Sequence, residues 1–182
     1  MKRFSLIVAL MVVTGVASRA SAEEAGGPNM LVAGAKSVSF ALPTLGDNPY
    51  YNGAAGAWYM LDDHMNIGAN VGLLVNPTGN GSTNWDWEVA LAPAVRYYLS
   101  TSGVVSPFIH GSAVVRFYDL AAESKHVGLS GSGGVGAEWF PVRNFSVAGQ
   151  TGLNIDIVRP DPGKPIKIAT FTSGLSVQVY WE

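Results

Sequence analysis

His110, Gly111 and Ser112 place a histidine and a serine two residues apart, which are residue types that a hydrolase uses. In an extended chain, residues i and i+2 project from the same face, so the imidazole and the hydroxyl would be neighbours. A carboxylate beside them would complete a triad in which His activates the Ser hydroxyl for attack on an acyl group. Ala113 and Val114 follow and lack the polar character expected beside such a site, so we disfavour this hypothesis.

Ionisable side chains recur on one face of the alternating stretches described below, and they could line a proton or ion path. The alternative is a set of buried ion pairs that fills the interior, because buried charges must be paired to be tolerated. We favour the second interpretation, with Arg96 and Arg116 pairing with Glu88 and Glu138. The residues concerned are Asp86, Glu88, Arg96, His110, Arg116, Glu138 and Asp156.

Asp62, Asp63 and His64 are adjacent and could suggest a metal site, but residues of this kind usually form turns. We therefore expect no metal site and no cofactor.

The stretch Trp85–Ser100, WDWEVALAPAVRYYLS, shows the element that must position such side chains. Every second residue from Trp85 is apolar or aromatic, and the residues between them are charged, small or amphipathic. A period of two predicts a β-strand. Pro93 falls in the middle of this strand, where it removes a ladder hydrogen bond, and we expect a β-bulge there.

Eight such runs occur along the chain, and their connections alternate between long and short. The long connections are 43–52, 76–84, 119–127 and 158–166, and the short ones are 62–64, 100–104 and 141–144. This alternation is typical of outer-membrane barrels, which have short periplasmic turns and long external loops. The face assignment of 53–61 stays open, because both of its faces are small or apolar. The predicted strands are 34–42, 53–61, 65–75, 85–100, 105–118, 128–140, 145–157 and 167–181.

The composition supports a membrane location for these strands. Charged residues make up 13% of the chain, against roughly 25% in a soluble domain. An eight-stranded barrel has an interior just wide enough for side chains, so it has no room for the many large apolar residues. We therefore predict an all-β, eight-stranded, antiparallel, up-and-down transmembrane β-barrel with its large apolar side chains in lipid. A soluble, lipocalin-like barrel with the opposite orientation is the alternative.

The first 22 residues, MKRFSLIVALMVVTGVASRASA, have the basic start, apolar centre and small-x-small end of a secretory signal peptide. Residues 23–33 form a short periplasmic lead-in, and 34–182 form the barrel. Cleavage removes Lys2, Arg3 and Arg19 from the 11 basic side chains and none of the 13 acidic ones, leaving eight against 13, a net charge of −5. Without a basic stripe, nucleic acid is excluded as a partner. The absence of Cys excludes disulfides and thiolate chemistry.

Several aromatic residues stand at the predicted ends of apolar strand faces, where a barrel carries girdles at the two membrane interfaces. Trp85 and Tyr97 bracket one strand, so its apolar set matches one membrane span. The expected girdle residues are Trp85, Trp87, Tyr97, Trp139, Phe145 and Trp181.

The segments WEVALAPAVRYYL, SPFIHGSAVVRFY and GVGAEWFPVRNFSVAGQTGLN resemble the small outer-membrane β-barrel proteins of the OmpA/OmpX type. The resemblance covers roughly Gly34 to Trp181 and implies fold and bacterial outer-membrane location more than activity. Such barrels usually end on an aromatic residue that the barrel-assembly machinery recognises, whereas here Glu182 follows Trp181. The resemblance also implies contact with outer-membrane lipids and lipopolysaccharide.

The function that we expect is a structural or surface-interaction role through the long loops, with an extracellular ligand of unknown identity and without catalysis. The alternatives are a narrow channel for ions or small solutes and, less favoured, a lipid A-modifying acyl hydrolase. Some outer-membrane lipid A deacylases carry a His-x-Ser pair like that of His110 and Ser112.

Overall fold

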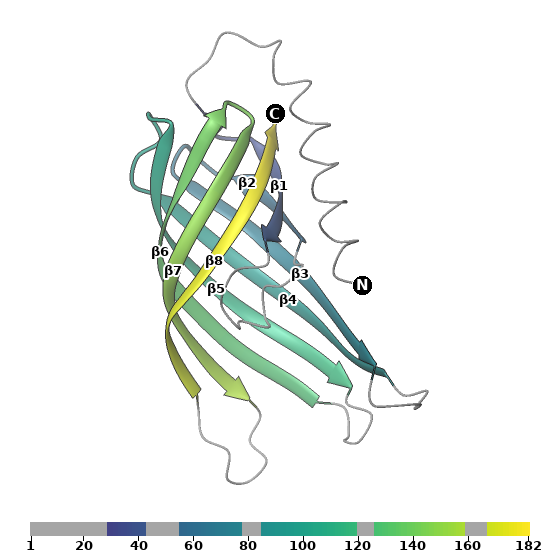
Figure 1. The fold of residues 1–182 in the computed structure, drawn as a ribbon. Helices are drawn as coiled ribbons and strands as arrows, with labels where there is room; N and C mark the ends of the chain where they lie inside the picture. Colours follow the sequence, from purple (N-terminus) through teal and green to yellow (C-terminus); the bar gives the residue numbers. More distant parts are fainter. Residues whose placement is uncertain (1–28, 43–54, 78–84, 120–125, 159–166) are drawn as a thin grey trace.

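A computed structural model describes residues 29–42, 55–77, 85–119, 126–158 and 167–182. Eight antiparallel strands form a closed barrel in which each strand pairs with its neighbours in the sequence and β1 pairs with β8 (Figure 1). The fold class is the predicted one. The strands are β1 Lys36–Leu42, β2 Ala55–Met60, β3 Met65–Pro77, β4 Trp85–Tyr98, β5 Val105–Asp119, β6 His126–Val142, β7 Phe145–Val158 and β8 Lys167–Trp181.

The two ends of the barrel differ in their connections. The turns at 61–64, 99–104 and 143–144 lie at one end, together with the start of β1 and the C-terminus, and we call this the turn end. It is the upper end in Figure 1. The opposite end, where β3, β5 and β7 finish, is called the loop end. The described residues contain no helix of the length and apolarity needed to span a membrane.

The prediction that large apolar side chains face outward is confirmed. Along β4, Leu91, Val95 and Tyr97 are exposed, whereas Arg96 and Tyr98 between and beside them are buried. The same alternation resolves β2, whose faces the sequence left open. Trp58 and Met60 face the lumen, and Tyr59 is exposed outside.

The prediction of a β-bulge at Pro93 is wrong. Pro93 pairs with Ala69 in an unbroken β3–β4 register, and the β4–β5 register is the same on both sides of it. The missing N–H therefore interrupts the ladder with β5 at Ala92 and Pro93 without shifting the strands.

A proline-associated bulge occurs at Pro141 instead. The β6–β7 register shifts between Trp139 and Val142, so β6 continues through Pro141, which we expected in the turn. A bulge tolerates proline because it leaves a residue unpaired. A second register shift lies between Gly152 and Leu153 of β7, where β8 has one additional residue between Thr170 and Thr172.

Candidate functional site

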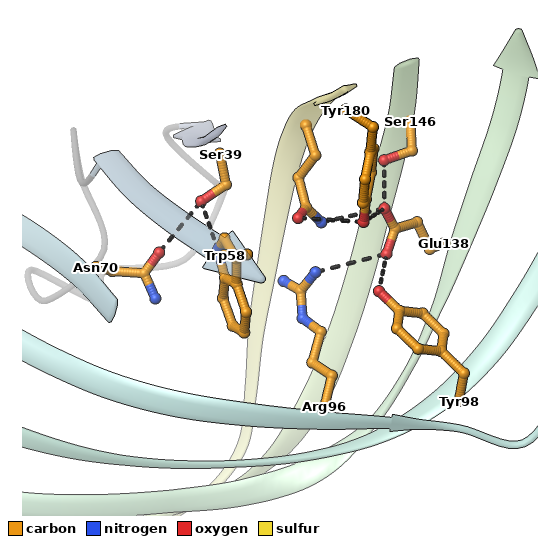
Figure 2. Close-up of polar contacts among 9 residues, drawn as sticks. Ser39, Trp58, Asn70, Arg96, Tyr98, Glu138, Ser146 and Tyr180 are labelled. Atoms are coloured by element: carbon orange, nitrogen blue, oxygen red, sulfur yellow. Dashed lines mark hydrogen bonds and ion pairs between the residues drawn. The ribbon is translucent and has the colours of Figure 1, made fainter. Parts of the chain in front are cut away.

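The carboxylate of Glu138 on β6 lies at the centre of a buried polar network inside the turn end of the barrel (Figure 2). Its Oε2 accepts a hydrogen bond of 2.5 Å from the Tyr98 hydroxyl. Its Oε1 accepts from the Tyr180 hydroxyl at 2.7 Å, from the Gln178 amide at 3.2 Å and from the Ser146 hydroxyl. Since these donors come from β4, β7 and β8, the network joins opposite walls of the barrel.

Arg96 supplies the positive charge beside Glu138. Its Nη1 lies 3.5 Å from Glu138 Oε2, and both side chains are buried. The guanidinium also packs against the ring faces of Trp58 and Phe108, at 4.4 and 4.9 Å from their centroids. Arg96 Nε has no hydrogen-bond partner among the described residues. The carboxylate is therefore held by several hydrogen-bond donors, whereas the guanidinium is held mainly by aromatic contacts.

Two glycines make room for these rings. A Cβ on Gly68 of β3 would lie 2.6 Å from Trp58 Cε3 and from the Ala57 carbonyl oxygen. A Cβ on Gly136 of β6 would similarly meet the ring of Phe108, with Phe108 Cε2 at 2.6 Å. The absence of a side chain on each neighbouring strand thus lets the two rings lie over that strand, where they contact Arg96.

Smaller hydrogen-bonded groups continue from this network toward the loop end. Trp58 Nε1 donates to Ser39 Oγ at 2.9 Å, and Ser39 Oγ donates to Asn70 Oδ1 at 3.2 Å (Figure 2). Farther along, Arg116 Nη2 donates to Ser130 Oγ at 2.9 Å. Hydrogen-bonded polar groups and packed side chains therefore occur along the length of the described lumen.

The predicted lumen residues do not all meet at one site. Arg96 and Glu138 form the ion pair at the turn end, and Arg116 is buried near the loop end beside Ser130. His110 is partly buried on β5, opposite Arg96 in register. The side chains of Asp86, Glu88 and Asp156 lie outside the described part of the structure, so the pairing expected for Glu88 stays a prediction.

The proposed hydrolytic pair faces the lumen and does not form a dyad. Ser112 Oγ lies 2.7 Å from Ser132 Oγ, and the two hydroxyls form a hydrogen bond. His110 Nε2 is buried without a hydrogen-bond partner among the described residues, and its ring makes an edge contact with Phe108. The geometry that would activate Ser112 as a nucleophile is therefore missing here.

The predicted girdle residues are mostly exposed on the outer face. Trp87, Tyr97, Trp139 and Trp181 are exposed, and Phe145 is half-buried. The side chain of Trp85 lies outside the described residues. Their role at a membrane interface stays a prediction.

Asp62, Asp63 and His64 form a hydrogen-bonded turn. Asp62 Oδ1 accepts from the backbone N–H groups of His64 and Met65, each at 2.7 Å. These two donors hold the pKa of Asp62 below its ordinary value. His64 Nδ1 lies 2.7 Å from the carbonyl oxygen of Tyr98, to which it can donate. No group of three metal-ligating side chains occurs among the described residues.

The sequence patterns did not single out most partners of Glu138. Tyr98, Ser146, Gln178 and Tyr180 all belong to the polar set of their strands, and all lie within a few residues of a short turn or of the C-terminus. Since antiparallel strands bring their turn-proximal residues to one level, this shared position is the signal that could have identified them.

The closed eight-stranded antiparallel barrel with an apolar outer face and a filled polar lumen is the fold of the small outer-membrane barrels. The structural comparisons support this class of fold. The N-terminal β-barrel domain of OprF from Pseudomonas aeruginosa is similar at 14% identity, with a TM-score of 0.51, over 82% of this chain and 98% of that chain. No protein-family model and no curated protein matches the sequence.

Two further solved structures are similar at lower scores. The attachment invasion locus protein Ail of Yersinia pestis covers 82% of this chain and 100% of its own, at 11% identity and a TM-score of 0.47. Neisserial surface protein A covers 80% and 93%, at 15% identity and a TM-score of 0.42.

Proposed function

We propose that this chain is an integral outer-membrane protein whose closed barrel anchors external loops, with a structural or surface-interaction role and without transport or catalysis. The observation that carries this proposal is the Glu138 network. It joins opposite walls of the barrel across the lumen by hydrogen bonds and an ion pair, inside an outer face of large apolar side chains.

The network supports an anchoring role rather than a channel. An eight-stranded barrel leaves little bore, and here Tyr98, Tyr180 and Phe108 are essentially inaccessible to solvent. The four longer connections, 43–54, 78–84, 120–125 and 159–166, join strands at the loop end and are the natural position for a surface ligand. The partners that this role implies are outer-membrane lipids and lipopolysaccharide, and the barrel-assembly machinery during insertion.

Fractionation of cells that produce the full chain tests the location. We expect recovery with outer membranes and a heat-modifiable mobility on gels, since a folded barrel resists detergent until it is heated. A freely soluble periplasmic product would overturn the proposal.

Planar-bilayer recording and lipid analysis test the role. We expect no discrete conductance steps from the purified protein. A narrow channel would show such steps, and their conductance would fall when Arg96 or Glu138 is substituted. We also expect overproduction of the protein and of Ser112→Ala to give the same lipid A profile. Discrete steps, or a profile change that requires Ser112, would contradict the proposed role.

A further inference from the structure

Residues Asn29–Ala35 lie at the turn end of the barrel, where Asn29, Met30, Leu31 and Ala35 are buried. We call this segment the N-terminal plug. Leu31 is 2% exposed and Ala35 is 1% exposed, and both belong to one apolar cluster with lumen residues. The cluster consists of Met30, Leu31, Ala35, Met60, Tyr98, Phe108, Phe140, Ala148 and Tyr180. Tyr98 and Tyr180 also donate hydrogen bonds to Glu138, so the plug packs next to the polar network on the side of the turn-end mouth.

The N-terminal plug ends in a tight turn that leads into β1. The N–H of Ala35 donates to the carbonyl oxygen of Val32 at 3.1 Å, and Gly34 has a φ of 88°. Residues with a side chain rarely adopt this φ, so glycine suits the turn. Two backbone bonds between residues 34–35 and Met60 then fix the turn to β2, which leaves Val32 exposed and Leu31 inside.

Asn29 anchors the other end of the N-terminal plug to the turn between β4 and β5. Its Nδ2 lies 2.7 Å from the carbonyl oxygen of Thr101, 2.9 Å from that of Gly103 and 3.4 Å from Ser106 Oγ. Its Oδ1 accepts from the N–H of Leu31 at 3.1 Å. In a closed barrel ordered β1 to β8, β5 lies opposite β1, so the segment crosses the full width of the mouth.

Several buried polar atoms lie in the lumen at the level of this apolar cluster. Ser37 Oγ and both polar atoms of the Asn66 side chain have no hydrogen-bond partner among the described residues. Ser37 is the first lumen-facing residue of β1 after the plug, and Asn66 pairs in register with Met60 of the cluster. Water that entered through the turn end would hydrogen-bond to these atoms, so their hydration favours opening of the mouth, and the plug lies between them and that mouth.

We propose that the N-terminal plug is a releasable closure of the turn-end mouth. It controls the entry of water to the lumen as far as the Arg96–Glu138 pair, which remains a second closure. The Asn29 contacts hold the plug shut, and the apolar side chains of Met30 and Leu31 make the seal.

Thiol labelling can test this closure because the natural chain has no Cys. Ser37→Cys places a reporter directly behind the plug, where the hydroxyl that it replaces has no described partner. The full-length protein is folded into phosphatidylcholine vesicles and exposed to a small charged methanethiosulfonate. Labelling is counted in the folded, fast-migrating gel band alone, so misfolded protein does not contribute.

We expect slow labelling of Ser37→Cys with the native plug. Asn29→Ala should raise the rate about tenfold or more, because it removes the side-chain anchors while it keeps the apolar seal residues. Leu31→Ser should raise the rate further. Val32→Ser is the matched control, since Val32 is exposed in the same segment, and it should leave the rate unchanged.

A second reporter, Ser132→Cys, lies on the loop side of the Arg96–Glu138 pair. Its labelling should not change in the plug variants if the pair remains closed. Unchanged labelling of Ser37→Cys in both Asn29→Ala and Leu31→Ser would overturn the proposal. So would an equal acceleration at Ser132→Cys, because that result indicates general loosening of the barrel. If Leu31→Ser gives no folded band, Asn29→Ala decides the outcome.

Discussion

The turn-end and loop-end halves of the lumen are closed in different ways. At the turn end, bulky rings, an ion pair and the N-terminal plug fill the barrel, and the described residues of β1 and β2, seven and six in number, pair there. Toward the loop end, the described lumen residues include small ones such as Gly72, Ala90 and Ala92, the hydrogen-bonded pair of Ser112 and Ser132, and Arg116 beside Ser130.

This difference teaches where a small barrel concentrates its stability. Buried rings and charged hydrogen bonds contribute more than exposed or partly buried serine pairs. We therefore expect the turn end to contribute more to the stability of the fold than the described part of the loop end does.

Substitution of the ion pair should give the largest effect and break this comparison most directly. Glu138→Gln leaves Arg96 charged among aromatic rings, and we expect a loss of about 3–5 kcal/mol in the free energy of unfolding. Arg96→Met should cost only about 1–2 kcal/mol, because four donors still hold the carboxylate. Urea titration of the protein in phospholipid vesicles, followed by gel mobility, measures both.

The loop-end control for this experiment is Ser112→Ala, which removes one partly buried hydrogen bond and should cost about 1 kcal/mol. A loss for Ser112→Ala equal to that for Glu138→Gln would show that the two halves contribute alike. Equal losses for Arg96→Met and Glu138→Gln would show that the neutral donors do not support the carboxylate.

Two glycines on β3 sharpen the comparison within one strand. Gly68→Ala introduces a Cβ against the Trp58 ring and should destabilise the barrel by about 1–3 kcal/mol, as overpacking does. Among the described residues, the Cβ of Gly72→Ala meets the Ala90 Cβ alone, at 3.7 Å, and the substitution should be nearly neutral. The same urea titration compares them, with Trp fluorescence as a second readout. A neutral Gly68→Ala would mean that Trp58 can move without loss.

The smallest effect concerns the turn that carries Asp62. Because backbone N–H groups lower its pKa in the folded state, Asp62 contributes stability fully above its unfolded pKa of about 3.9. That contribution is lost as the pH falls through the folded pKa. The difference in unfolding free energy between the wild type and Asp62→Asn should therefore be present at pH 7 and disappear in strong acid. A pH-independent difference would contradict this assignment.

The strands and their outward faces could be predicted because side chains alternate between the two faces of a strand and lipid favours apolar residues on one of them. The resulting period of two is a local pattern in the sequence. The face of β2 could not, since Gly68 on β3 decides where the Trp58 ring fits. The N-terminal plug was missed for a similar reason. Met30 and Leu31 are buried only because the closed barrel presents a mouth opposite them, and no local period reports such a long-range contact. Pro93 and Pro141 show that a proline predicts a ladder defect without saying whether the register shifts.

The path of the N-terminal plug also constrains the order of assembly. Asn29 contacts residues 72 to 77 positions later in the chain, across the barrel from the strand that follows it. Docking therefore requires the β4–β5 turn to be formed, and the apolar cluster that receives Leu31 includes residues of β2, β4, β5, β6, β7 and β8. Contacts of such high sequence separation form late. We therefore expect the first described residues of the chain to be among the last to reach their native position, so that their burial marks a completed barrel.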